Sequence, residues 1–131
     1  MDLATLEPGR TLAVEPIRFN AGDIAAYREA VGAPADASGH APPMAIAAWA
    51  MRSAMRAVEL PAGAVHVSQE LEFFRALPDE ADLGCTTVVA RNGVRRGVRF
   101  LVIEFTVGDD GGTALRGSAT ISITSAEETG A

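Results

Sequence analysis

Two side chains that can move protons, Asp36 and His40, lie four residues apart in the run GAPADASGHAPPM, residues 32–44. An imidazole titrates near neutral pH and can act as a general base, and a nearby carboxylate can orient it or handle a second proton. These two residue types could therefore act together as an acid–base pair. The alternative is a polar loop in which His40 only caps a helix.

A long helix is predicted directly after this pair, from Ala41 to Glu59, because good helix formers follow two prolines that fit only a first helical turn. The N–H groups at a helix N-terminus can stabilise negative charge that develops on a carbonyl oxygen. Pro42 and Pro43 remove two such donors, whereas Ala41 and Met44 keep theirs. We therefore expect a weakened oxyanion site at this end of the helix.

Other reactive residue types are scarce. Cys85 is the one cysteine, so an internal disulfide is excluded, and its strand-like surroundings predict a buried core residue. With no lysine there is no Schiff base, and two histidines without clustered ligands predict no metal site and no cofactor. His66 is expected on the wet face of a strand. A run of arginines can bind the phosphates of a pantetheine arm or form a charged hairpin: Arg95, Arg96 and Arg99.

Length and composition predict one domain, residues 1–131, with a loose tail from about residue 125. The 48% hydrophobic and 21% charged residues are ordinary for a globular protein. A net charge of −6 argues against a nucleic acid or an anionic membrane as partner. No uncharged run is long enough to span a bilayer and the N-terminus lacks a signal-peptide pattern, so a cytoplasmic location is expected.

The elements that must position Asp36 and His40 follow a simple order: a strand, a short helix, the long helix, and then four strands joined by hairpins. The first strand is expected at 11–19 and the short helix at 21–31, capped by Asn20 and ended by Gly32. The later strands are expected at 65–73, 83–91, about 101–107 and 114–124. Hairpin loops are expected at Asn92-Gly93 and in the DDGG run, residues 109–112. The fold class is α+β.

Apolar periodicity predicts which sides of these elements are buried. On the long helix one stripe is expected to face the core: Met44, Ala48, Met51, Met55 and Val58. Trp49, Arg52, Arg56 and Glu59 share the opposite side. On the strand at 65–73, Val65, Val67, Leu71 and Phe73 are expected to share the buried face.

Several strings of the sequence, in this order, resemble the MaoC-like, R-hydratase type dehydratases of the hotdog superfamily. Asn20 to Gly32 resembles the family's opening helix, and Pro61 to Pro78 resembles the strand that ends in an aromatic-Arg-x-x-Pro corner. Arg95 to Ile123 resembles the last hairpin with its acidic-Gly turn. The resemblance spans about residues 10 to 124. It implies a hotdog fold, an antiparallel sheet wrapped around one long central helix, and a homodimer with a continuous sheet.

The resemblance also implies roles for individual residues. The family carries its catalytic Asp and His in an Asp-x-Asn-Pro-x-His run, followed by a longer insert and a His-Gly. Here this region is shortened, and Asp36 and His40 are the matching pair. A second alignment places His40 at the later His-Gly and leaves both catalytic positions deleted. The substrate would contact Ala41, Met44, Phe74 and Arg75.

Three functions remain open from the sequence. The first is a hydro-lyase that dehydrates or hydrates an acyl thioester carried on coenzyme A or an acyl carrier protein. The second is a non-catalytic hotdog subunit that binds an acyl chain or supports an active partner. The third is a cyclase or isomerase acting on a polyketide-like molecule in a secondary-metabolite pathway. The shortened loop favours the last two, and the retained Asp36 and His40 favour the first and third.

Overall fold

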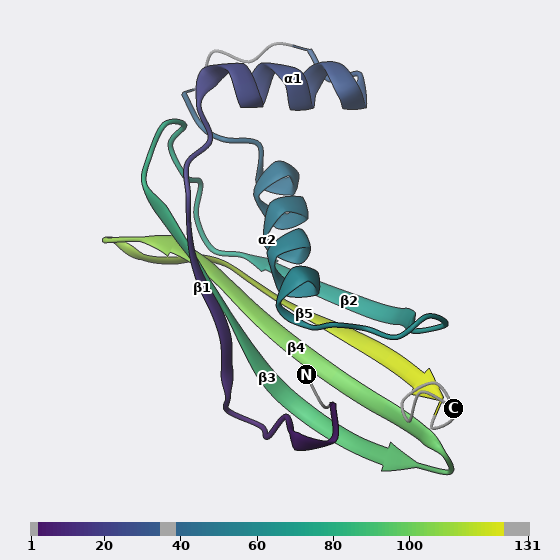
Figure 1. The fold of residues 1–131 in the computed structure, drawn as a ribbon. Coiled ribbons are helices and arrows are strands. Elements are labelled where there is room, and N and C mark those ends of the chain that lie inside the picture. Colours follow the sequence, from purple (N-terminus) through teal and green to yellow (C-terminus); the bar gives the residue numbers. More distant parts are fainter. Residues whose placement is uncertain (1–2, 35–38, 125–131) are drawn as a thin grey trace.

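The computed structural model describes residues 3–34 and 39–124 of the chain. It contains one antiparallel sheet, two α-helices and a short 3-10 helix (Figure 1). The elements are η1 (Leu3–Thr5), β1 (Thr11–Ile17), α1 (Ala21–Val31), α2 (Pro43–Ala57), β2 (Val65–Phe73), β3 (Leu83–Arg95), β4 (Val98–Asp109) and β5 (Gly112–Thr124). None of the described helices is long and apolar enough to cross a bilayer. The predicted α+β hotdog arrangement is confirmed.

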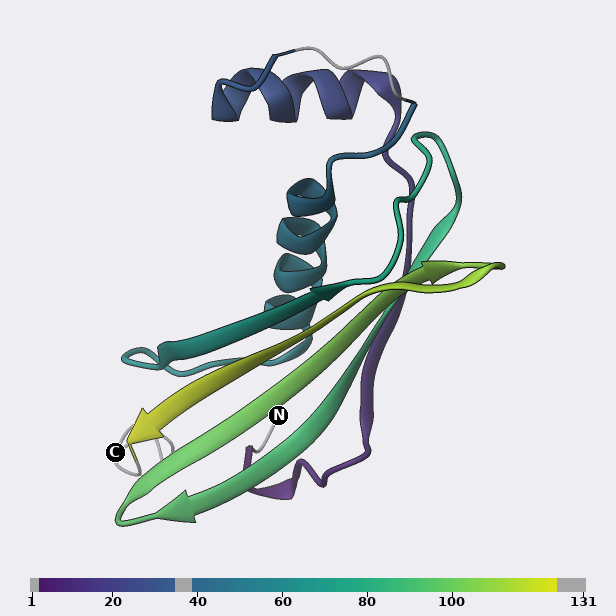
Figure 2. The ribbon, with the colours of Figure 1, turned by 180° about the vertical axis from the view of Figure 1, so that it is seen from behind.

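The sheet has the strand order β1-β3-β4-β5-β2, so β1 and β2 form its two edges (Figure 2). Strands β3, β4 and β5 are joined by hairpins and form its centre. Helix α2 packs against β1, β3 and β4 on one face, which we call the inner face. The other face is the outer face, and its described side chains are exposed or half-exposed.

The short helix α1 begins and ends as the sequence predicts. The Asn20 side chain accepts from the Asp23 N–H at 2.8 Å, and the Asp23 carboxylate accepts from the Asn20 N–H, which completes a capping box. Gly32 ends the helix with a left-handed φ of 70°. The predicted boundaries of this helix are confirmed.

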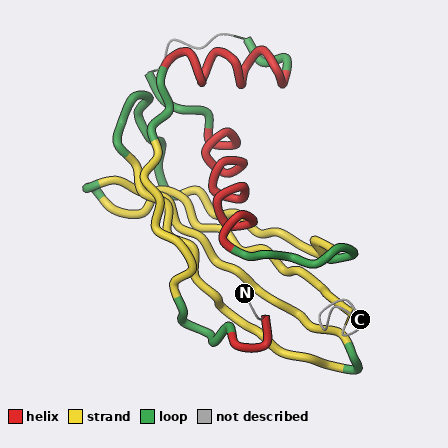
Figure 3. The backbone as a smooth tube through the Cα atoms, in the orientation of Figure 1, coloured by secondary structure: helices red, strands yellow, loops and turns green. Residues whose placement is uncertain are grey.

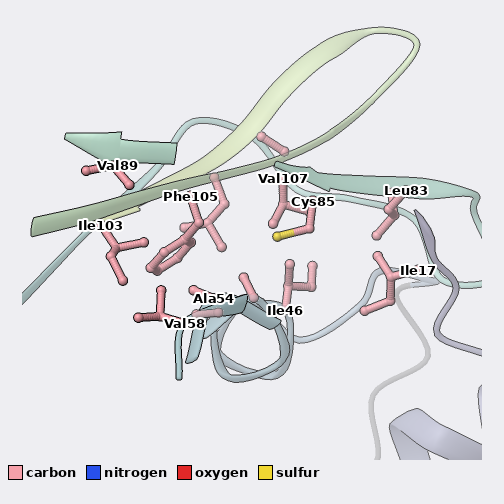
Figure 4. Close-up of a cluster of buried hydrophobic side chains, with 14 of the residues drawn as sticks. Ile17, Ile46, Ala54, Val58, Leu83, Cys85, Val89, Ile103, Phe105 and Val107 are labelled. Carbon is pink, nitrogen blue, oxygen red and sulfur yellow. The ribbon is translucent and has the colours of Figure 1, made fainter. Parts of the chain in front are cut away.

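The buried side of α2 differs from the predicted one. The core contains small residues of this helix together with one isoleucine: Ala45, Ile46, Ala47, Ala50, Ser53 and Ala54 (Figure 4). Val58 is buried as predicted, and Met51 and Met55 pack half-buried against the core. Met44 is 53% exposed and Ala48 is exposed, so the predicted stripe is wrong for these two residues and is not the centre of the buried side. The alanines form the buried side because they let the sheet approach the helix backbone closely. Larger side chains of the helix then lie at the edge of the helix–sheet contact.

Strand β2 also departs from its predicted pattern. Leu71 and Phe73 pair with Gly117 and Leu115 on the inner face, as expected. A bulge between His66 and Ser68 then shifts the register, so Val65 pairs with Ser122 on the outer face. The prediction of one apolar face from residue 65 to 73 is therefore wrong. His66 lies opposite Ile121 in the sheet, yet it is exposed, as its predicted place on a wet surface requires.

The hairpin between β3 and β4 turns later than the Asn92-Gly93 pair predicts. The turn lies at Arg96 and Gly97, which both have positive φ, as a two-residue primed turn requires. The Asn92 side chain instead donates to the Leu3 and Leu6 carbonyls at 2.7 and 2.8 Å. Asn92 thus ties the N-terminal segment to the sheet rather than making a turn.

Candidate functional site

The candidate site lies where the loop from α1 to α2 meets the loop from β2 to β3, at the N-terminal end of α2 (Figure 3). The Ala41 N–H donates to the Leu77 carbonyl at 2.9 Å, and the Asp79 N–H donates to the Gly39 carbonyl at 2.9 Å. His40 pairs with Pro78 in a β-bridge between these two bonds. This short ladder fixes the chain on which His40 lies and sets where α2 begins.

The first turn of α2 offers few hydrogen-bond donors. Pro42 and Pro43 have no N–H, and the Ala45 and Ile46 N–H groups both donate to the Pro42 carbonyl at 3.0 and 3.3 Å. The Ala41 N–H is already engaged with the β2–β3 loop. Within the described residues, Met44 is left as the residue of the first turn whose N–H donates to no backbone carbonyl.

The predicted acid–base pair is only half described. His40 is exposed and stands four residues before Met44, at the same end of α2. Asp36 lies outside the described residues, so its pairing with His40 stays a prediction. Among the described residues there is also no group of three or more His, Cys, Asp or Glu side chains that could hold a metal ion.

A small cavity lies beside the start of α2. Ala41, Pro43 and Ile46 line it from the helix side, and Leu77, Ala114 and Leu115 line it from the sheet and the loop. Its volume is about 10 Å³, which is the space of one water molecule. An acyl thioester does not fit into it within a single chain.

The four predicted substrate contacts occupy different positions at this end of the molecule. Ala41 and Arg75 line the small cavity, whereas Met44 and Phe74 are not among its lining residues. Met44 and Phe74 are 53% and 52% exposed, and Phe73 beside them is 46% exposed. Phe73 also lines the small cavity, and the exposed parts of these three side chains leave apolar surface at this end of the molecule. Their role in binding a substrate stays a prediction.

Arg75 fastens the corner after β2 to the hairpin between β4 and β5. Its guanidinium donates to both carboxylate oxygens of Asp109 and to the Gly112 carbonyl. The hydrogen bonds from Arg75, together with the Gly111 N–H at 2.8 Å, lower the pKa of the Asp109 carboxyl. The sequence contains both the aromatic-Arg-x-x-Pro corner and the acidic-Gly turn, but nothing in it predicts that the two meet.

Phe74 is held on its exposed side by a second basic residue. The Arg116 guanidinium lies 5.8 Å from the centre of the Phe74 ring, within the range of a cation–π contact. Arg75 and Arg116 therefore fix the two sides of the same corner. This corner and the 39–41 ladder lie around the start of α2.

Comparisons with known proteins support the fold. No protein-family model matches the sequence, and the search of curated proteins found no significant match. The MaoC-like dehydratase from Rhodospirillum rubrum has a similar structure, with a TM-score of 0.74, 17% identity, and coverage of 95% of this chain and 97% of that one. The (R)-hydratase from A. caviae involved in PHA biosynthesis gives a TM-score of 0.63 and 20% identity, with coverage of 89% and 96%.

A third similar structure is the HadBC complex from Mycobacterium tuberculosis, a 3R-hydroxyacyl-ACP dehydratase. Its TM-score is 0.64 at 14% identity, with coverage of 89% of this chain and 98% of that one. The chain therefore has the hotdog fold that these dehydratases and hydratases share.

Proposed function

We propose that this protein is a hydro-lyase that adds water to, or removes it from, an acyl thioester at the N-terminal end of α2. The observation that carries the proposal is the placement of His40 and the Met44 N–H at one end of the central helix, on a segment held by the 77–79 loop. The hydratase and dehydratases of the same fold support the reaction class.

The residues would divide the chemistry as follows. His40 takes the proton from the carbon next to the thioester carbonyl, and Asp36 orients the imidazole or handles the hydroxyl group that leaves. The Met44 N–H, strengthened by the helix dipole, donates to the thioester oxygen as negative charge develops on it. One backbone donor is a modest oxyanion site, so we expect a slow enzyme.

A second copy of the chain is part of the proposal. The cavity beside α2 has the volume of one water, so a thioester arm needs additional space and walls. Apolar surface beside the site comes from Met44 in the first turn of α2, from Phe73 at the end of the edge strand β2, and from Phe74 directly after it. A partner paired along β2 would cover this surface and complete a tunnel for the acyl arm.

The test is the hydration of a 2-enoyl thioester, followed by the loss of its conjugated absorbance. Replacing His40 with Ala should lower turnover by roughly 10²-fold or more, the usual contribution of a general acid–base group. Arg52→Ala, at an exposed position of α2 outside both the site and the proposed β2 seam, is the control and should leave turnover unchanged. Full activity of His40→Ala on a substrate that the unmodified protein turns over would rule out the acid–base role.

The second candidate function is a non-catalytic subunit that binds an acyl chain. The two prolines favour it, and so do the Ala41, Ala45 and Ile46 N–H groups that already donate to carbonyls, because among the described residues little is left to stabilise an oxyanion. In that case the unmodified protein binds a non-hydrolysable acyl thioester analogue, measured by calorimetry, but hydrates no enoyl thioester. His40→Ala would then leave this binding unchanged.

A further inference from the structure

The outer face of the sheet carries a basic hollow at the end of the β3–β4 hairpin. Its volume is about 490 Å³, and we define it by Arg91, Gly93, Arg95, Phe100 and Val102. In the sheet register Arg91 lies opposite Val102, and Gly93 lies opposite Phe100. Because alternate residues of a strand share a face, Arg91, Gly93 and Arg95 all border the outer face.

The hollow is basic in an acidic protein. The whole chain has 17 acidic and 11 basic residues, yet residues 83–103 contain four arginines and no acidic residue. Arg99 belongs to the inner side, where it is 8% exposed and donates to the Asn92 side-chain oxygen at 2.7 Å. Arg91, Arg95 and Arg96 remain exposed, and they form no ion pair with any residue from 3 to 34 or 39 to 124.

The floor of the hollow is open and apolar. A Cβ added at Gly93 would meet nothing within 4 Å, so the position midway between Arg91 and Arg95 is open. Phe100 is 41% exposed and lies opposite this gap. A ligand that fills the hollow therefore meets an aromatic ring between two guanidinium groups.

The spacing indicates what kind of partner fits. Arg91 and Arg95 are four residues apart on one strand, so their backbones are about 13 Å apart. An extended segment with carboxylates four residues apart and a bulky apolar residue midway has the same spacing. Arginine forks bind carboxylates well, and an aromatic floor suits an apolar side chain. The net charge of −6 disfavours a nucleic acid or an anionic membrane in this place.

We infer that the basic hollow docks an acidic segment of another protein, through carboxylates on Arg91 and Arg95 and an apolar side chain on Phe100. The hollow is separate from the candidate site. Strand β3 extends about 33 Å from Leu83, which lies near the start of α2, to Gly93. The β3–β4 hairpin therefore lies at the opposite end of the sheet from the candidate site (Figure 1). The docked segment would therefore leave the α2 end accessible.

The experiment uses a fluorescent peptide with glutamates at its first and fifth positions and a leucine at its third, in an otherwise Ser-Gly sequence. Its binding to the full chain is measured by anisotropy at about 50 and 200 mM salt. We expect saturable binding that weakens at the higher salt. Charge reversal of the arginines, Arg91→Glu with Arg95→Glu, should weaken it at least tenfold, and Phe100→Ser should also weaken it. Circular dichroism checks the fold, and paired Gln substitutions replace the reversal if it fails to fold.

Two controls separate this docking from general charge attraction. Arg52→Glu makes the same charge change on an exposed residue of α2 and should leave peptide binding unchanged. A peptide with Gln in place of both Glu residues should bind at least tenfold more weakly. The inference is overturned if no saturable peptide binding appears up to millimolar protein, or if Arg52→Glu weakens peptide binding as much as the double reversal. It is also overturned if ADP binds the protein more tightly than the peptide does and the arginine variants lose this ADP binding.

Discussion

At the scale of single residues, Cys85 is the group whose surroundings change its chemistry most clearly. Its side chain is fully buried between β3 and α2 (Figure 4). Burial, and next the negative charge of Glu15, raise the pKa of the thiol to about 11, although the hydroxyls of Ser53 and Thr87 partly oppose this. The sequence prediction of a buried core cysteine is confirmed. Cys85 is thus an inert structural thiol rather than a nucleophile.

Two measurements follow for Cys85. A thiol reagent at pH 8 should label it only as fast as the protein unfolds, whereas in denaturant it should react at once. Since the folded-state pKa is raised from 9.0 to about 11, the protonated thiol contributes stability that is fully present below pH 9 and is lost as the pH rises to about 11. The melting temperature should therefore fall more between pH 9 and 11 than it does in Cys85→Ala. Rapid native-state labelling would contradict the burial argument.

At the scale of elements, the sheet and α2 approach each other through small residues. A side-chain carbon added at Gly117 on β5 would lie 2.3 Å from the Phe105 ring, which is fully buried opposite it. Across the core, Ala50 and Ala54 of α2 are also fully buried. The packing therefore depends on the absence of side-chain volume at defined positions as much as on the presence of large apolar groups.

We predict that Gly117→Ala lowers the free energy of unfolding by about 1–3 kcal/mol, the usual cost of overpacking a core. Gly84→Ala is the matched control on β3, because a side chain there would meet nothing within 4 Å, and it should change stability little. Adding Phe105→Leu to Gly117→Ala should cost less than the sum of the two single changes, measured by urea denaturation. Strict additivity would show that the two residues do not compete for space.

The element order was predictable because each boundary has a local cause, such as the Asn20 cap, Gly32 and the acidic-Gly turn. Which side of α2 is buried was not predictable, because this helix is apolar on most sides and periodicity cannot choose among them. The bulge near Val67 depends on pairing with β5, which lies about 50 residues further along the chain. For the site, the position of His40 at the start of α2 was predictable from the sequence. The pairing of Arg75 with Asp109 was not, because it depends on tertiary contact alone.

At the scale of the whole molecule, the two edges of the sheet are unequal. The edge strand β2 has Val65 and Val67 more than half exposed, and it ends in the partly exposed Phe73, with exposed Phe74 directly after it. Free strand edges with apolar side chains pair with another chain unless they are protected. The described residues show no covering element over β2, and its side chains are almost all exposed.

We therefore predict a homodimer paired along β2 in solution. Sedimentation velocity at micromolar concentration should give about twice the 13.6 kDa chain mass. The double substitution Val65→Lys with Val67→Lys should raise the dissociation constant of the dimer at least tenfold, because charges on an edge strand oppose pairing. Val14→Lys is the control on the other edge, β1, where Val14 is 70% exposed. A monomeric unmodified protein, or an equal effect of Val14→Lys, would contradict β2 pairing.

The placement of β1 and β2 at opposite edges also sets an order of events during folding. Strands β3, β4 and β5 are consecutive hairpins and close short loops, whereas β1 joins β3 across the whole of both helices. Because long loops cost more entropy to close, the three central strands should form first and both edges should dock afterwards. Pulse-labelling hydrogen exchange should find the β4 amides protected before those of β1 and β2. The surface proposed to join two chains would then be the last part of each chain to form, so the nascent protein would expose its pairing edge only once its core exists.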